Sequence, residues 1–85
     1  MSCYVLDAHY LTEPVSAQYY LAWELHLPTH YGHNLDALAD CLGEMGEGTE
    51  IVLQNAAACT GYAERVRRVL RDCAQNERAY RYIEE

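Results

Sequence analysis

The pattern of apolar and polar positions along this 85-residue chain predicts three strands and three helices. The first strand covers residues 3–6, a continuous apolar run of the kind found in a central strand. The second covers residues 50–54, whose apolar centre we expect to be buried on both faces of the sheet. Residues 78–83, in which Arg and Tyr alternate before Ile83, predict the last strand.

Each predicted helix has an apolar stripe with spacings of three and four residues. The first helix begins after Thr12, its expected cap, has Pro14 in its first turn and continues to His26. Trp23 falls beside the stripe, and we expect it in the core or at its boundary. Asn34 is the expected cap of the second helix. The stripes are Ala17, Tyr20 and Leu21 in the first helix, Leu35, Leu38 and Leu42 in the second, and Tyr62, Val66, Val69, Leu70 and Cys73 in the third.

The order of these elements is strand, helix, helix, strand, helix, strand. Parallel strands need long connections, which the helices supply. The order therefore predicts an α/β fold in which a small three-stranded parallel sheet is packed by helices. Residues 1–85 suffice for a single domain with a modest core.

Charge is divided unevenly along the chain, whose formal net charge is −7. All six cationic residues are arginines within residues 65–81, whereas residues 1–64 contain nine acidic residues and no Lys or Arg. Such a surface repels nucleic acid and anionic membranes and attracts a basic protein. Arg65, Arg68 and Asp72, spaced by three and four residues, are expected to pair with one another and support the third helix. Whether the face of residues 65–71 binds anything stays open.

Asp36 and Asp40 lie four residues apart, nearly opposite the apolar stripe of the second helix. No Lys or Arg is near them in sequence, and like charges at this spacing cost an isolated helix roughly 0.2–0.5 kcal/mol. Two interpretations remain open at this point. The acids either stay solvated on a surface helix, or they are kept free for another molecule.

Other classes of function find no support in the sequence. It contains no run of 18 apolar residues and no signal-peptide pattern, so we expect a cytoplasmic protein that does not span a membrane. Its four cysteines show no C-x-x-C spacing and are expected to be reduced thiols. Phosphate-binding, dinucleotide-binding and nucleophile-elbow motifs are absent, so we expect neither an enzyme nor a cofactor.

Three histidines, His26, His30 and His33, are spaced by four and three residues, as zinc ligands on a helix would be. Pro28 and Gly32 interrupt any helix between them, so we expect no metal site. We favour the alternative that His30 and His33 lie in a binding interface, where protonation in mildly acidic solution would alter affinity.

Residues 25–42, LHLPTHYGHNLDALADCL, are the most informative stretch. They resemble the signature of the barstar family, small intracellular inhibitors of secreted ribonucleases. The positions of the resemblance are Leu25, Leu27, Pro28, Tyr31, Gly32, Asn34, Leu35, Asp36, Ala37, Leu38, Asp40, Cys41 and Leu42. The resemblance implies a barstar-like fold, a parallel three-stranded sheet packed by helices, in agreement with the order of elements above.

The resemblance also implies a partner-binding surface on the second helix and the segment before it. Asp40 corresponds to the family residue that takes the place of a substrate phosphate, where a carboxylate accepts charge-assisted hydrogen bonds. The last helix offers one further acidic contact, and Glu44 lies in a Gly-rich acidic loop at residues 43–48. The expected surface consists of Tyr31, Gly32, His33, Asn34, Asp36, Asp40, Glu44 and Asp72.

Four positions depart from the family pattern. His30 replaces a Tyr, His33 replaces an acidic residue, and Ala39 and Met45 stand where the family has aromatic residues. The expected function is inhibition of a basic secreted ribonuclease by a protein that is monomeric when free. Because the departures border the contact surface, the alternative is an immunity or adaptor protein for a basic toxin or effector that is not a ribonuclease.

Overall fold

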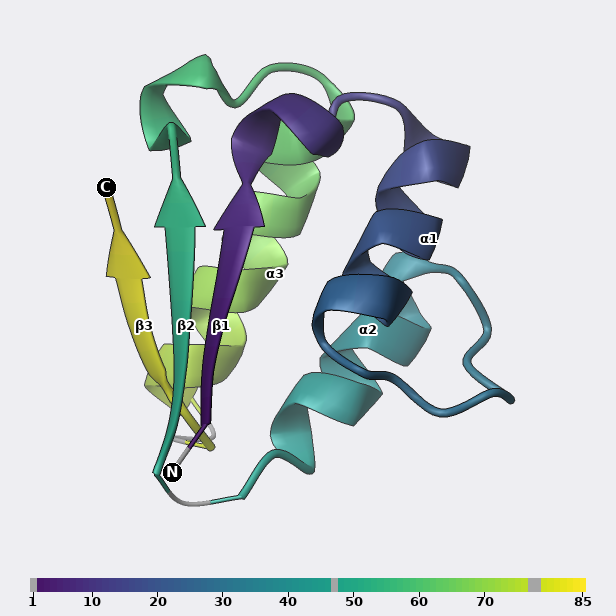
Figure 1. The fold of residues 1–85 in the computed structure, drawn as a ribbon, viewed down its shortest axis with the longest axis vertical. Coiled ribbons are helices and arrows are strands. Elements are labelled where there is room, and N and C mark those ends of the chain that lie inside the picture. Colours follow the sequence, from purple (N-terminus) through teal and green to yellow (C-terminus); the bar gives the residue numbers. More distant parts are fainter. Residues whose placement is uncertain (1, 47, 77–78) are drawn as a thin grey trace.

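The computed structural model of the chain describes residues 2–46, 48–76 and 79–85. Glu47 of the predicted acidic loop and Arg78 at the start of the predicted last strand lie outside the described residues. The helices and strands are β1 (Ser2–Asp7), α1 (Pro14–Glu24), α2 (Leu35–Gly43), β2 (Thr49–Gln54), α3 (Tyr62–Asn76) and β3 (Arg81–Glu84) (Figure 1). Two short 3-10 helices, η1 (Ala8–Tyr10) and η2 (Ala56–Ala58), follow β1 and β2.

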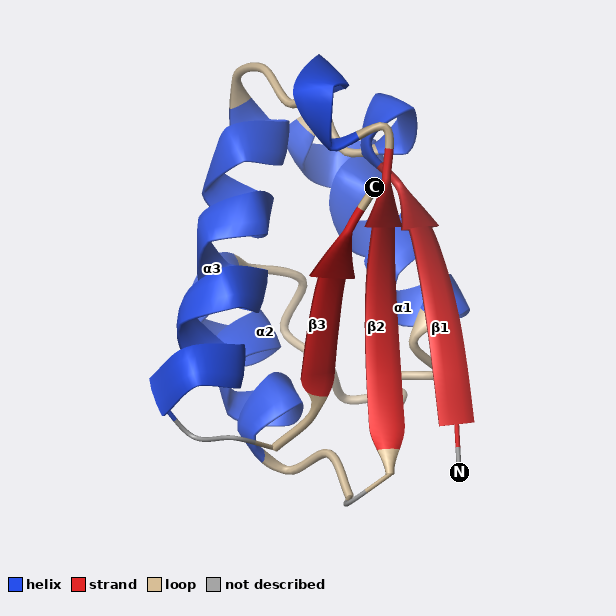
Figure 2. Ribbon diagram, turned by 90° about the vertical axis from the view of Figure 1, so that its left-hand side faces the viewer, coloured by secondary structure: helices blue, strands red, loops and turns tan. Residues whose placement is uncertain are grey.

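The three strands form one parallel sheet in the order β1, β2, β3, which confirms the predicted α/β fold class. Figure 2 shows the three α-helices gathered on one face of this sheet. The prediction of a central first strand is wrong, because β1 lies at an edge and Val5 on its uncovered face is 43% exposed. The central strand is β2, where Ile51, Val52 and Leu53 are buried as predicted.

The core lies between the sheet and the helices. Leu38 and Leu42 of α2 are completely buried, and Leu35 is half-buried, so the predicted stripe faces the core. In α1 the inward stripe is Ala17 and Leu21, and it continues to Leu25 after the helix. In α3 the buried residues are Ala63, Val66 and Leu70. No helix in the described part of the chain combines the length and apolar character that crossing a membrane requires.

Trp23 departs most from prediction, since its side chain is 80% exposed instead of lying in or beside the core. Trp23 follows the buried Leu21 by two positions, about 200° around the helix, which places it on the opposite face. The start of α1 also differs, because its N-cap is Glu13, whose side chain makes no capping bond. Pro14 occupies the first turn as predicted, and its preset φ favours a helix start without a capping side chain.

Candidate functional site

The start of α2 is fixed by Asn34, the cap that the sequence predicted. Its Oδ1 accepts a hydrogen bond from the Ala37 N–H at 2.7 Å, and its Nδ2 donates to the Gly32 carbonyl at 3.3 Å. A Cβ on Gly32 would lie 3.3 Å from the Asn34 Nδ2 atom and 3.4 Å from the Ala37 Cβ atom, so glycine allows the loop to approach the cap. These contacts set the position of the first turn of the helix.

Asp36 and Asp40 are exposed on the outer side of α2. Burial of Leu38 and Leu42 on the opposite side fixes the rotation of the helix, and hence the direction of both carboxylates. Among the described residues, no hydrogen bond or ion pair engages either carboxylate. The chain therefore presents two acidic groups one turn apart on a rigid helix without neutralising them itself.

The acidic character continues to the end of α2. Glu44, the C-terminal cap residue, is exposed, and its backbone N–H donates to the Cys41 carbonyl at 3.2 Å. Burial, followed by the nearby Glu44 and Asp40 carboxylates, raises the pKa of the Cys41 thiol. The thiol therefore stays protonated and adds no reactive nucleophile to this face. Met45, which the sequence comparison placed at an aromatic position, is half-buried against the core.

The structure places Tyr31 in the core, with only 5% of the residue exposed, although the sequence placed it on the contact surface. Its hydroxyl donates to the Gln18 Oε1 atom and lies 3.3 Å from the Asn34 carbonyl oxygen. The Gln18 Nε2 atom in turn donates to the Tyr62 hydroxyl at 2.5 Å. Tyr31 thus anchors the loop before α2 to α1 and α3, and burial raises its phenol pKa, which keeps it a hydrogen-bond donor.

Gln18 is a positioning residue that the sequence reasoning missed. It is the one polar or charged side chain that is buried in the described residues, with 2% exposed. Gln18 lies three residues before Leu21, and this spacing places both on the inner side of α1. The spacing was the signal in the sequence that could have predicted the burial of Gln18. Because its amide oxygen accepts from Tyr31 and its amide nitrogen donates to Tyr62, both polar atoms of this buried side chain have a partner.

Two of the three histidines, His33 and His26, pack on different aromatic rings. The His33 ring is 4.5 Å from the Tyr19 ring and 5.0 Å from the Tyr31 ring, whereas the His26 ring is 5.9 Å from the ring of Tyr4. His30 and His33 are both exposed. Within the described residues, no group of three or more His, Cys, Asp or Glu side chains is arranged to hold a metal ion.

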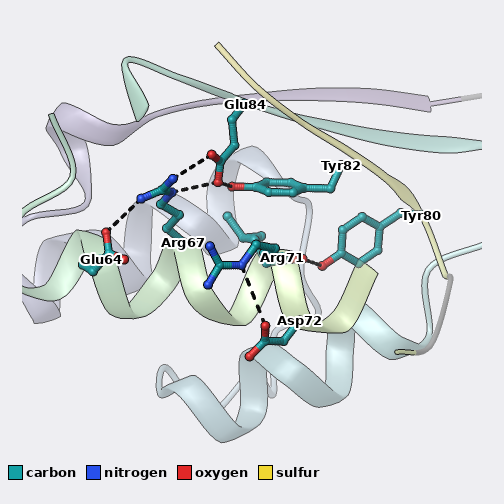
Figure 3. A network of polar contacts seen from close by, with 8 residues as sticks. Glu64, Arg67, Arg71, Asp72, Tyr80, Tyr82 and Glu84 are labelled. Atoms are coloured by element: carbon teal, nitrogen blue, oxygen red, sulfur yellow. Dashed lines mark hydrogen bonds and ion pairs between the residues drawn. The ribbon is translucent and has the colours of Figure 1, made fainter. Parts of the chain in front are cut away.

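Asp72 is exposed on α3, and Figure 3 shows it on the side of that helix toward α2. The predicted pairing of Asp72 with Arg65 and Arg68 is wrong, since Asp72 Oδ1 lies 3.9 Å from the Nε atom of Arg71 instead. Adjacent residues on a helix point in different directions, so this pair is long. Asp72 is therefore an exposed acidic group beside α2 that forms a long ion pair with Arg71.

The arginine that is firmly held is Arg67. Its Nε and Nη2 atoms bind the two carboxylate oxygens of Glu84 at 2.8 and 2.9 Å, and its Nη1 atom lies 3.3 Å from Glu64 Oε2 (Figure 3). The Tyr82 hydroxyl donates to Glu84 Oε2 at 2.7 Å. The Arg67 guanidinium, followed by Tyr82, holds the pKa of the Glu84 carboxyl below its usual range. This network joins α3 to β3 through an arginine that the predicted pairs did not include.

Seven of the eight predicted site residues, all except Tyr31, are therefore exposed. Six of them lie on α2 and its two ends, while Asp72 comes from the neighbouring α3. The arrangement offers preset carboxylates and contains no activated nucleophile. Its chemistry is suited to accepting hydrogen bonds from cationic side chains.

Comparison with known proteins agrees with this arrangement. The family model described as Barstar (barnase inhibitor) matches residues 1–83. No curated protein matches the chain. The family consists of inhibitors and not of enzymes, and its protein partners are barnase-like ribonucleases. With nearly its whole length matched, and with a three-stranded parallel sheet packed by helices, the chain belongs to the barstar family of barnase inhibitors.

Proposed function

We propose that this protein inhibits a basic, barnase-like ribonuclease by binding over its active site with the outer face of α2 and the loop before it. The observation that supports this best is the exposure of Asp36 and Asp40, which no cation of the described chain engages. Ribonuclease clefts collect cationic groups to bind the phosphates of RNA, and preset carboxylates compete for the same groups. The protein acts by occlusion and needs no catalytic group.

Rigid presentation of the acids favours tight binding. Asn34 holds the first turn of α2, the Tyr31 hydroxyl ties the loop to Gln18, and two buried leucines hold the opposite side of the helix. A carboxylate that is already fixed loses less conformational entropy when it binds. The uneven charge of the chain accelerates the encounter with a basic partner at low ionic strength.

We assign to Asp40 the position that a phosphate of RNA would take in the active site of the ribonuclease. Asp36 lies in the first turn of α2, where the free N–H groups of the helix start already compensate its charge. Asp40 lies one turn further on and lacks this compensation, so it gains more from an arginine of the partner. Asp72, beside α2, supplies a further acidic contact, and His33 and Glu44 mark the two ends of the surface.

The departures at His30, His33, Ala39 and Met45 favour a second candidate partner, a basic toxin that is not a ribonuclease. These positions border the proposed surface, and specificity is set by differences in such contacts. The same acidic face would then cover the cationic cleft of another effector. In either case we place the protein in the cytoplasm of the cell that makes the toxin, as a free monomer that protects its host.

Inhibition of RNA cleavage tests the first candidate. The purified protein is mixed with several barnase-like ribonucleases, and cleavage of a fluorescent RNA is followed while the inhibitor is raised to micromolar concentration. We expect cleavage to stop near equimolar inhibitor for at least one enzyme. The variant Asp36→Ala/Asp40→Ala should lose inhibition, whereas Glu50→Ala/Glu85→Ala, which removes the same charge from β2 and the chain end, should retain it. Undiminished cleavage by every enzyme, with recovery of a basic protein of another kind as the bound partner, would favour the second candidate.

A further inference from the structure

The outer face of α1 carries an apolar stripe that the core does not use. Val15, Tyr19 and Trp23 follow one another at intervals of four residues and are 72%, 63% and 80% exposed. They are three of the five large apolar side chains that are exposed in the described residues. Single exposed apolar residues are ordinary, but an aligned stripe that contains two aromatic rings is characteristic of a protein contact.

This stripe is continuous with the proposed inhibitory surface. The Tyr19 ring lies 4.5 Å from the ring of His33, the residue before the Asn34 cap of α2. The residue before Tyr19 on α1, Gln18, binds Tyr31 in the same loop. Figure 1 shows this loop leading from the end of α1 to the start of α2, on the side of the molecule away from β3. The aromatic stripe and the acidic face of α2 thus meet at His33.

The charge around the stripe selects the kind of molecule that it fits. Glu13 precedes α1 and Glu24 ends it, and no Lys or Arg occurs before residue 65. Exposed tyrosine and tryptophan rings could stack on RNA bases, but nucleic acid binding also needs cations for the phosphates. A second copy of this chain would bring like charges together. Arginine and lysine side chains of a basic protein fit best, because they stack on aromatic faces and are attracted by the neighbouring acids.

We propose that Val15, Tyr19 and Trp23 form a second contact for the same basic partner that binds α2, with Trp23 stacking on a cationic side chain outside the active-site cleft. This inference rests on the proposed function, because it places the partner on α2 first. Aromatic residues dominate the affinity of many protein interfaces, and a tryptophan offers a large rigid surface at low entropic cost. The stripe would thereby increase affinity without touching the catalytic groups of the partner.

Alanine variants test the stripe against the ribonuclease that the wild-type protein inhibits. Trp23→Ala is expected to raise the Kd about tenfold or more, and Tyr19→Ala about threefold or more. The matched control is Tyr10→Ala, which removes an aromatic side chain that is 61% exposed and packs on Tyr20 instead of the stripe. Its Kd should stay within about twofold of the wild type. Far-UV circular dichroism establishes that each variant is folded, which we expect because the removed side chains are outside the core.

A second readout locates the contact directly. Trp23 is the single tryptophan, so protein labelled with 5-fluorotryptophan gives one fluorine resonance that reports on this side chain alone. Addition of unlabelled ribonuclease should shift that resonance, and the Asp36→Ala/Asp40→Ala variant should require more ribonuclease for the same shift.

The outcomes separate this inference from the proposed function. One outcome would overturn the proposed contact of the stripe and leave the proposed function of α2 intact. In that outcome the wild type inhibits the enzyme, Trp23→Ala binds it equally well, and the fluorine resonance does not move. If the wild type binds neither a ribonuclease nor another basic protein, both proposals fail. If the free protein sediments as a dimer that Trp23→Ala converts to a monomer, a second copy occupies the stripe, and the inference is also overturned.

Discussion

The hydroxyl of Tyr31 joins the loop before α2 to the core, and Tyr31→Phe removes that single atom while keeping the ring. Tyr31 is 5% exposed and its acceptor residue Gln18 is 2% exposed, so water cannot replace the lost donor freely. A buried polar atom left without its partner costs about 1–3 kcal/mol. The Asn34 carbonyl loses little, because it still accepts from the Leu38 N–H at 2.9 Å. We therefore expect the free energy of unfolding to fall by about 1–3 kcal/mol.

Urea titration followed by far-UV circular dichroism measures this loss. Tryptophan fluorescence suits the purpose less well, because Trp23 is already 80% exposed in the folded protein. In a domain of this size, each 1 kcal/mol should also lower the Tm by about 4–8 °C. The control is Tyr10→Phe, which removes an exposed hydroxyl and should change the unfolding free energy by less than about 0.5 kcal/mol.

The affinity of the Tyr31→Phe variant for the ribonuclease distinguishes two roles of Tyr31, an internal anchor of the loop or a residue that contacts the partner. A buried hydroxyl that only positions the loop leaves the Kd for the inhibited ribonuclease within about threefold, a change of less than 1 kcal/mol. An unfolding free energy equal to the wild type, together with a tenfold loss of affinity, would refute the reasoning. That result would mean that the hydroxyl faces the partner and that the bond to Gln18 contributes nothing to the fold.

The remaining predictions concern α2 and the tyrosines. Asn34→Ala should lower the unfolding free energy by about 0.5–2 kcal/mol, whereas Asn34→Asp keeps the capping oxygen and should cost much less; equal losses in urea titrations would argue against the cap. Asp40→Ala should raise the inhibition constant for RNA cleavage more than Asp36→Ala does, and equal or negligible increases would remove the phosphate-mimic role. Burial raises the pKa of Tyr31 and, aided by Glu84, that of Tyr82. The unfolded chain therefore releases these protons first, so the unfolding free energy should decline as the pH rises above about 10, and a profile that stays flat to about pH 11 would contradict this.

The sequence was sufficient for the features that local chemistry determines. The spacing of Leu35, Leu38 and Leu42 and the capping side chain of Asn34 predicted a helix that the structure places at Leu35–Gly43. The order of elements predicted the parallel sheet, and the family resemblance is confirmed by the match to residues 1–83. In each case the signal lies within a few residues of the feature, or in the order of elements along the chain.

Features that depend on distant residues could not be predicted in this way. The burial of Tyr31 requires Gln18 on α1, and Gln18 in turn binds Tyr62, which lies 44 residues away in sequence. The exposure of Trp23 depends on which side of α1 meets the sheet. The apolar run in β1 could not reveal that this strand lies at an edge of the sheet, since an edge strand and a central strand can share such a run. It also could not reveal that helices cover only one face of the sheet.

The placement of the arginines explains why α2 stays acidic in a chain that contains six of them. Arg67 is engaged by Glu64 and Glu84 at the junction of α3 and β3, and Arg71 lies near Asp72. Had one of these side chains turned to Asp36 or Asp40, the carboxylate would be neutralised before any partner arrived, and the partner would have to break that pair. Within the described residues no such pair forms, so neither carboxylate is neutralised by a cationic side chain of the chain itself. We therefore expect a basic partner to be drawn to α2, where Asp36 and Asp40 are exposed and, among the described residues, unpaired.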